Sequence, residues 1–139
     1  MVLVRDQFPL EAREPNYSMT LINESSALDA LGGDKNLLME LAKMFVEDAP
    51  IALATLRKAM ESENSRAVLS EVHMLKGLVS TFFAKEVVEQ ARRLEEAAAI
   101  GNLTLLSNGG FRELRRSIEA MILDFQSLGW VDPHLNEAV

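Results

Sequence analysis

The sequence predicts an all-α protein, an antiparallel four-helix bundle with a short extra helix at its N-terminal side. Apolar residues recur at intervals of three and four along four long stretches, which is the period of a helix that buries one face. No stretch alternates apolar and polar residues as a half-buried strand would. Because the connections between the four stretches are short, we expect neighbouring helices to pack side by side in alternating directions.

The ends of the chain are expected to lie outside the bundle. Residues 1–18 have no clear period and contain two prolines, so we interpret them as an extended or mobile arm. Asn23 offers an N-cap for the short extra helix, which Gly32-Gly33 ends. We therefore predict one bundle domain over residues 19–130 and a short C-terminal tail over 131–139.

The four main helices are placed by their caps and breaks. The first begins after Asp34 and runs to about residue 61, and Pro50 inside it predicts either a kink or a fresh helix start. The next two are predicted over about 65–83 and 85–100. The last is predicted over about 111–128, where a glycine follows the final apolar residue.

The composition narrows the class of protein before any motif is considered. The chain has 139 residues, of which 48% are hydrophobic and 25% charged, and this fits one globular domain. Since it has no cysteine, a disulfide framework and a thiolate zinc site are excluded, and a cytoplasmic location is expected. The net charge of −7 argues against nucleic acid as a partner. No apolar run approaches the ~20 residues that cross a bilayer, so we expect no membrane partner. We also expect the protein to be a monomer.

One of the two histidines stands in a distinctive place on its helix. A helical wheel at about 100° per residue puts the apolar residues of 66–84 on one arc, which must face the core. These residues are Val68, Leu69, Val72, Leu75, Val79, Phe82 and Phe83. His73 lies just past the edge of that arc, on an exposed strip, and Lys76 lies at the border. The other residues of the strip are Ser70, Gly77, Ser80 and Ala84.

This arrangement suits the chemistry of a phosphoryl acceptor. Neutral imidazole, with an unperturbed pKa of about 6.5, is a nucleophile that can attack an acyl phosphate. Lys76 can reach the same face and offset the charge of the added group. Gly77 costs roughly 1 kcal/mol of helix propensity relative to alanine, and clearance for a docking partner is a reason for it.

Spacing alone leaves other roles open for these side chains. A single helical histidine is more often a solvated or packing residue, and Lys76 can be a surface lysine that covers the core edge. A metal site is less favoured, because His134 lies far along the chain and no Glu-x-x-His pair is present. Ser70 and Ser80 lack the Gly-x-Ser-x-Gly elbow of a hydrolytic serine. We therefore predict no metal and no bound cofactor in this chain.

At these residues the sequence resembles the histidine-containing phosphotransfer (HPt) domain family. The segment Val72–Gly77 resembles the family signature His-x-Leu-Lys-Gly preceded by a small or apolar residue. Leu31–Asp34 resembles the family's usual opening into its second helix, which commonly carries an aromatic residue at the position of Phe45. Ala91–Glu95 resembles part of the next helix. The resemblance covers about residues 25–128.

The resemblance implies a phosphocarrier of a two-component phosphorelay. His73 would accept a phosphoryl group from a receiver-domain aspartate and pass it to another receiver domain. Lys76 would stabilise the phosphoryl charge, and Gly77 would leave clearance for the partner. The implied partners are response-regulator receiver domains and a hybrid sensor histidine kinase, with Mg²⁺ held by the receiver. The chain lacks a glycine-rich phosphate loop and kinase motifs, so no kinase activity of its own is expected.

Two residues depart from the family pattern. The family tends to have a small residue at the position of Leu78 and a glycine at the position of Phe83. We expect these departures to affect partner fit more than the fold. The docking residues predicted beside His73 are Ser70, Ser80, Phe83 and Ala84.

Two alternatives to the carrier function remain at the level of the sequence. The first is a non-catalytic helical interaction bundle that binds or inhibits a receiver or kinase domain without being phosphorylated, and Phe83 favours it. The second is a dimeric structural bundle, held together by an exposed apolar patch of Leu78, Phe82 and Phe83.

Overall fold

The structure is a computed structural model that describes residues 21–133, and it is all-helical within that range. It contains no strand there, so the predicted all-α class is confirmed. Five α-helices are present between residues 21 and 133, and a kinked segment, Leu106–Gly110, directly precedes the last; Asn108 and Gly109 within it have non-helical backbone angles. Their bounds are α1 Glu24–Ala30, α2 Lys35–Glu61, α3 Ser65–Ser80, α4 Lys85–Ala99 and α5 Phe111–Ser127. The predicted arm over 1–18 and most of the predicted tail, including His134, lie outside the described residues.

Side-chain caps fix where the first three helices begin. The carboxamide of Asn23 accepts a hydrogen bond from the Ser26 N–H, and the Asp34 carboxylate accepts one from the Leu37 N–H. Asn64 caps α3 in the same way. Each cap satisfies a backbone donor that has no partner inside the helix, which is worth about 1 kcal/mol.

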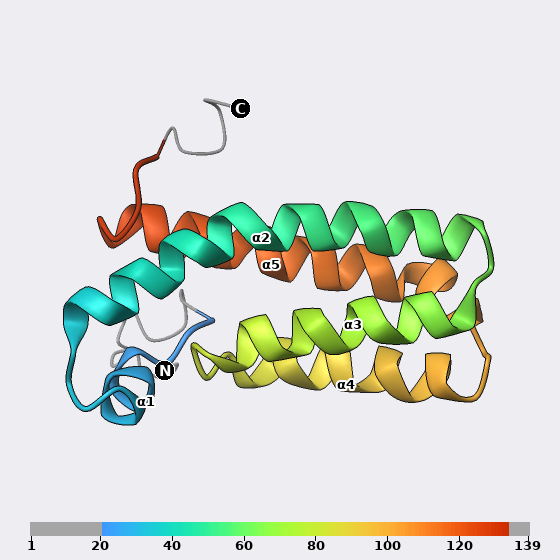
Figure 1. The fold of residues 1–139 in the computed structure, drawn as a ribbon, viewed down its shortest axis with the longest axis horizontal. Helices are drawn as coiled ribbons and strands as arrows, with labels where there is room; N and C mark the ends of the chain where they lie inside the picture. The colour runs from blue at the N-terminus through green and yellow to red at the C-terminus, as the bar shows by residue number, and fades with distance from the viewer. Residues whose placement is uncertain (1–20, 134–139) are drawn as a thin grey trace, which may run out of the picture.

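Proline 50 does not divide α2 into two helices. The helix continues through it from Lys35 to Glu61 as one element. Figure 1 shows that α2 bends part-way along its length. Because proline has no N–H and its ring crowds the preceding turn, a bend at this point is the expected response. Of the two sequence-based alternatives at Pro50, the fresh start is therefore wrong.

The four longer helices lie alongside one another, and α1 lies across one end (Figure 1). The turns after α2 and α4 lie at one end of the molecule, and the turn after α3 lies at the other. The most extensive packing joins α3 to α4, followed by α2 to α3. The α3–α4 pair is therefore the most extensively packed pair of helices in the described part of the chain. No helix within residues 21–133 is long and apolar enough to span a membrane.

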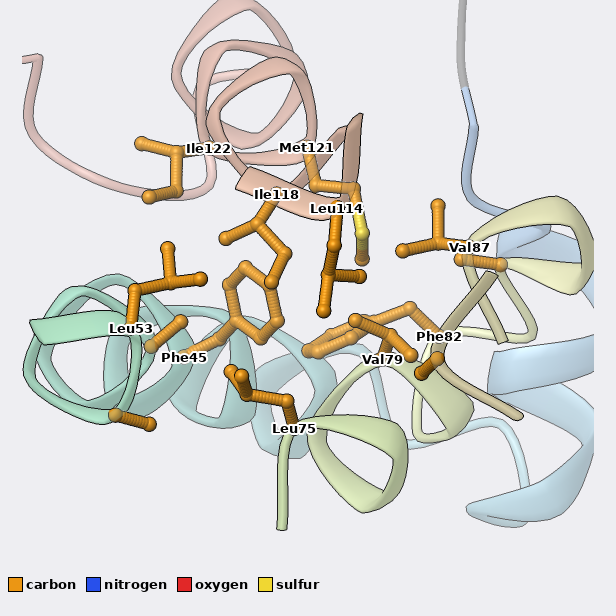
Figure 2. Close-up of a cluster of buried hydrophobic side chains, with 14 of the residues drawn as sticks. Phe45, Leu53, Leu75, Val79, Phe82, Val87, Leu114, Ile118, Met121 and Ile122 are labelled. Atoms are coloured by element: carbon orange, nitrogen blue, oxygen red, sulfur yellow. The ribbon is translucent and has the colours of Figure 1, made fainter. Parts of the chain in front are cut away.

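The core is made of apolar side chains from α2, α3, α4 and α5, and Figure 2 shows a part of it. Three phenylalanines, Phe45, Phe82 and Phe125, are at most 1% exposed and contact one another, with ring centroids 4.7 to 5.6 Å apart. Trp130 stacks on Phe125 at 5.6 Å. Val131, the first residue of the predicted tail, is also buried, so the packed part of the chain extends past α5.

Candidate functional site

His73 projects from the middle of α3 into solvent. Four residues on the opposite side of this helix, Val68, Val72, Leu75 and Val79, are fully buried and fix its rotation against the core. The His73 side chain is 69% exposed as a consequence. The wheel-based prediction that His73 lies outside the buried arc is therefore confirmed.

A carboxylate from the neighbouring helix holds one side of the His73 ring. Oε2 of Glu95, on α4, lies 2.5 Å from Nδ1 of His73. Oε1 of the same carboxylate accepts a hydrogen bond from Nζ of Lys76 at 2.6 Å. Glu95 thus bridges the two side chains that the sequence singles out, and its own side chain is only 19% exposed.

The charge on Glu95 decides which imidazole nitrogen is free. The hydrogen bond from Lys76 is the largest effect on the pKa of Glu95 and lowers it; burial opposes this, and the bond from His73 lowers it further. An ionised carboxylate only accepts hydrogen bonds, so Nδ1 of His73 is the donor. In a neutral ring the lone pair then resides on Nε2, and the side chain as a whole is 69% exposed.

The other predicted strip residues differ in what they expose. Ser70, Gly77 and Ser80 are exposed, as predicted. A Cβ built on Gly77 would meet nothing within 4 Å, so the fold itself does not require glycine there. The Ser80 hydroxyl donates to the backbone carbonyl of Lys76 at 2.7 Å and is thus engaged with its own helix.

The prediction that Ala84 lies on the exposed strip is wrong. Ala84 is fully buried and occupies the N-cap position of α4. Phe83, which the wheel placed in the buried arc, is instead 45% exposed. The reason is that α3 ends at Ser80 and the chain turns through a left-handed conformation at Phe83, with φ of 53°. A helical wheel does not apply beyond the end of its helix.

This turn also removes the apolar patch suggested for a dimer. Phe82 is 1% exposed and belongs to the aromatic core, and Leu78 is half-buried against that core. Only Phe83 of the three presents a largely exposed ring. It lines a surface hollow of about 470 Å³ together with Ser80 and Lys85.

Sequence reasoning missed two residues of the site. Glu95 contributes the carboxylate that orients His73, yet it comes from another helix, twenty-two positions along the chain. Met74, next to His73, is 51% exposed and adds an apolar side chain to this surface. Met74 could have been identified from the sequence, because it is an apolar residue on an otherwise polar helix face. Glu95 could not, because the register between α3 and α4 cannot be obtained from spacing within one helix.

Fold and site together define a helical bundle with an exposed histidine on its outer surface, oriented by a carboxylate of the neighbouring helix. A model of the protein family described as Hpt domain matches residues 40–124, which is more than half of the chain and includes His73, Lys76 and Glu95. The chain therefore belongs to the Hpt domain family, and this membership implies a phosphotransfer role in phosphorelays. Comparisons with curated proteins and with solved structures gave no match.

Proposed function

We propose that this protein is a phosphocarrier that accepts a phosphoryl group from a receiver-domain aspartate on Nε2 of His73 and passes it to another receiver domain. One observation carries the proposal: the His73 ring is 69% exposed while Glu95 engages its Nδ1. An oriented ring with one free nitrogen is what in-line attack on phosphorus requires. The antiparallel four-helix bundle, which the short turns at alternate ends support, would serve as the rigid base.

The proposed transfer needs few groups from this chain. Nε2 of His73 attacks the phosphorus atom, the bond from phosphorus to the aspartate oxygen breaks, and aspartate leaves as a carboxylate. The ring keeps its Nδ1 proton and becomes cationic, so the adjacent Glu95 carboxylate stabilises the product. Lys76, one turn away and bonded to the same carboxylate, would offset the negative charge of the phosphoryl oxygens. Attack by a second receiver's aspartate reverses these steps and restores neutral His73.

The partners follow from the family and from the exposed surface. Hpt domains work with receiver domains and kinases, and we propose a hybrid sensor histidine kinase as the source of the first phosphorylated receiver. Ser70, Gly77, Ser80 and Phe83 are the proposed docking residues, since all four are exposed. The buried Ala84 has no place in that surface and instead supports the start of α4. We assign Mg²⁺ to the receiver, whose aspartyl phosphate it would neutralise.

The decisive experiment is intact-protein mass spectrometry after incubation with a receiver domain that carries a phosphoryl group. We expect one phosphoryl adduct on the wild type, labile in acid and stable in alkali, and none on His73→Gln. Circular dichroism of His73→Gln should match the wild type, because the side chain is exposed. An adduct of equal yield on the variant would refute His73 as the acceptor.

A second candidate function is supported by Phe83. A largely exposed aromatic ring beside a hollow can anchor a partner without any chemistry. A non-catalytic interaction bundle would bind a receiver or kinase domain equally well after His73→Ala and would form no phosphohistidine. Binding that persists in the absence of any adduct, across a panel of receivers, would favour this function over the carrier.

A further inference from the structure

A second charged feature of the molecule lies between α2 and α5, whereas His73 lies on α3 and Glu95 on α4. Figure 1 shows α2 and α5 side by side, and their packing is direct. A hollow of about 210 Å³ opens where the second half of α2 meets the kinked segment Leu106–Gly110 and the first turns of α5. We call it the arginine hollow.

Three arginines line the arginine hollow: Arg57, Arg112 and Arg115. No carboxylate is among its lining residues in the described part of the chain. The cluster is thus opposite in sign to the chain as a whole, whose net charge is −7. Within residues 21–133, neither Arg57 nor Arg112 forms an ion pair.

Two of the three arginines, Arg57 and Arg115, are in contact with the rest of the fold. Arg57 lies over the ring of Phe111, with its guanidinium carbon 5.8 Å from the ring centroid. Nε of Arg115 is buried and has no hydrogen-bond partner among the described residues. Arg115 forms an ion pair with Glu119, but the Nε to Oε2 distance of 3.8 Å is too long for a hydrogen bond. A buried donor without an acceptor is unfavourable, and a bound anion would supply the missing acceptor.

We infer that the arginine hollow binds a phosphate-type oxyanion, either inorganic phosphate or a phosphomonoester group. Planar guanidinium groups bind phosphate oxygens through paired N–H donors, and three of them can neutralise a dianion. A larger adjoining groove, of about 470 Å³, is lined by Arg57 and Arg115 but also by Glu61 and Glu119. Those carboxylates would repel an extended acidic segment, so a compact anion confined to the hollow is favoured. The inference does not depend on the function of His73.

Nitrogen-15 NMR titration of the full chain with inorganic phosphate tests the inference. Backbone signals of residues 106–115 should shift in a saturable way, beyond the shifts caused by sodium chloride at equal ionic strength. Arg112→Gln should raise the dissociation constant at least about tenfold, because an exposed arginine without an ion pair is removed. The matched control is Arg116→Gln, on the same helix but outside the hollow, and it should change the constant less than about twofold. A parallel titration with glycerol phosphate, a phosphomonoester, shows by its dissociation constant whether the hollow prefers a phosphomonoester or inorganic phosphate.

Four results would overturn the inference. One is the absence of saturable shifts up to about 50 mM phosphate, which would leave only ionic screening. Another is equal weakening by Arg112→Gln and Arg116→Gln, which would indicate diffuse attraction to positive charge. The third is displacement of phosphate by a glutamate-rich peptide at lower concentration, which would assign the hollow to a carboxylate-bearing protein partner. Backbone signal shifts confined to residues near His73 would also overturn the inference, because phosphate would then bind outside the arginine hollow.

Discussion

Glu95 links the exposed imidazole of His73 to the rest of the fold. Its two carboxylate oxygens accept hydrogen bonds from different side chains of α3, so the positions of His73 and Lys76 depend on one residue of α4. A ring that is 69% exposed would otherwise sample several rotamers. At the scale of single residues, Glu95 is therefore a positioning residue for the proposed transfer.

Replacing Glu95 with glutamine should slow phosphoryl transfer by about tenfold or more without unfolding the protein, because the charge that orients and stabilises the ring is lost. The measurement is the rate at which a phosphorylated receiver loses its label to the variant. Glu96→Gln is the matched control, since among residues 21–133 Glu96 pairs only with Arg92, on the exposed face of α4. Equal rates for the wild type and both variants would remove Glu95 from the mechanism.

The same substitution has a signature in the pH dependence of stability. The pKa of Glu95 is lowered in the folded state, chiefly by the hydrogen bond from Lys76. Its carboxylate therefore contributes stability above the pKa of the unfolded chain, and this contribution is lost as pH falls through the folded pKa. The difference in unfolding free energy between wild type and Glu95→Gln should shrink toward acid pH in urea titrations.

Phe83 combines backbone strain with an exposed ring. A left-handed conformation costs a non-glycine residue roughly 1–2 kcal/mol, so Phe83→Gly should relieve strain and leave the unfolding free energy within about 1 kcal/mol of the wild type. Phe82→Ala, in the buried core, should cost about 3–5 kcal/mol. If Phe83 docks a receiver, Phe83→Gly should weaken receiver binding in calorimetry while leaving His73 competent for labelling by a small phosphodonor. Unchanged receiver affinity would show that Phe83 lies outside the interface.

At the scale of elements, two glycines have opposite roles. Gly77 lies inside α3 with open space where a Cβ would stand, whereas a Cβ on Gly110 would lie 2.6 Å from Cδ2 of Leu94 and 2.7 Å from the carbonyl oxygen of Leu105. The first glycine weakens its helix without improving packing. The second allows the start of α5 to approach α4 closely.

Alanine substitutions should separate these two roles. Gly77→Ala is expected to raise the free energy of unfolding by about 0.5–1 kcal/mol, the difference in helix propensity, and to slow transfer if a partner needs the space. Gly110→Ala is expected to lower the free energy of unfolding by about 1–3 kcal/mol, because the Leu94 side chain and the backbone at Leu105 must shift. Chemical denaturation measures both changes. A loss of stability in Gly77→Ala would mean that the fold, and not a partner, requires that glycine.

The sequence was sufficient for the elements but not for the contacts between them. Helix period and capping residues placed each helix to within a few residues, since both signals lie in neighbouring positions of the chain. Ala84 and Phe83 were misplaced because the end of α3 depends on the packing of Phe82 into the aromatic core. His73 could be found from one helix. Glu95 could not, because the relative rotation of α3 and α4 is set by the whole core.

At the scale of the whole molecule, the segment before α1 is tied to the bundle at two points. The backbone N–H of Leu21 donates to Oδ2 of Asp124 on α5 at 3.1 Å, and the N–H of Asn23 donates to the carbonyl of Phe82 at 2.9 Å. Burial raises the pKa of Asp124, and the bond from Leu21 partly offsets this. The bundle thus holds a carboxylate whose ionised form the fold disfavours.

Asp124→Asn should change stability with pH in the opposite sense to Glu95→Gln. The pKa of Asp124 is raised in the folded state. Its contribution to the free energy of unfolding is therefore fully present below its pKa in the unfolded chain, and is lost as pH rises through its pKa in the folded protein. Relative to the wild type, Asp124→Asn should therefore gain stability between about pH 4 and pH 7, while its amide oxygen still accepts from Leu21. Thermal unfolding across that range measures the difference. A variant that loses stability toward neutral pH would show that the charge of Asp124 is needed.

Pro50 has a consequence for how α2 opens. Without an N–H at this position, the carbonyl of Val46 lacks its usual donor, so the ladder of hydrogen bonds along α2 is interrupted once. Amide protons exchange with solvent through local opening, and such an interruption separates cooperative units. The residues of α2 before Pro50 can therefore open and exchange their amide protons separately from the residues after it. We therefore expect hydrogen exchange to divide α2 into two units that meet at Pro50, although the helix is continuous in the structure.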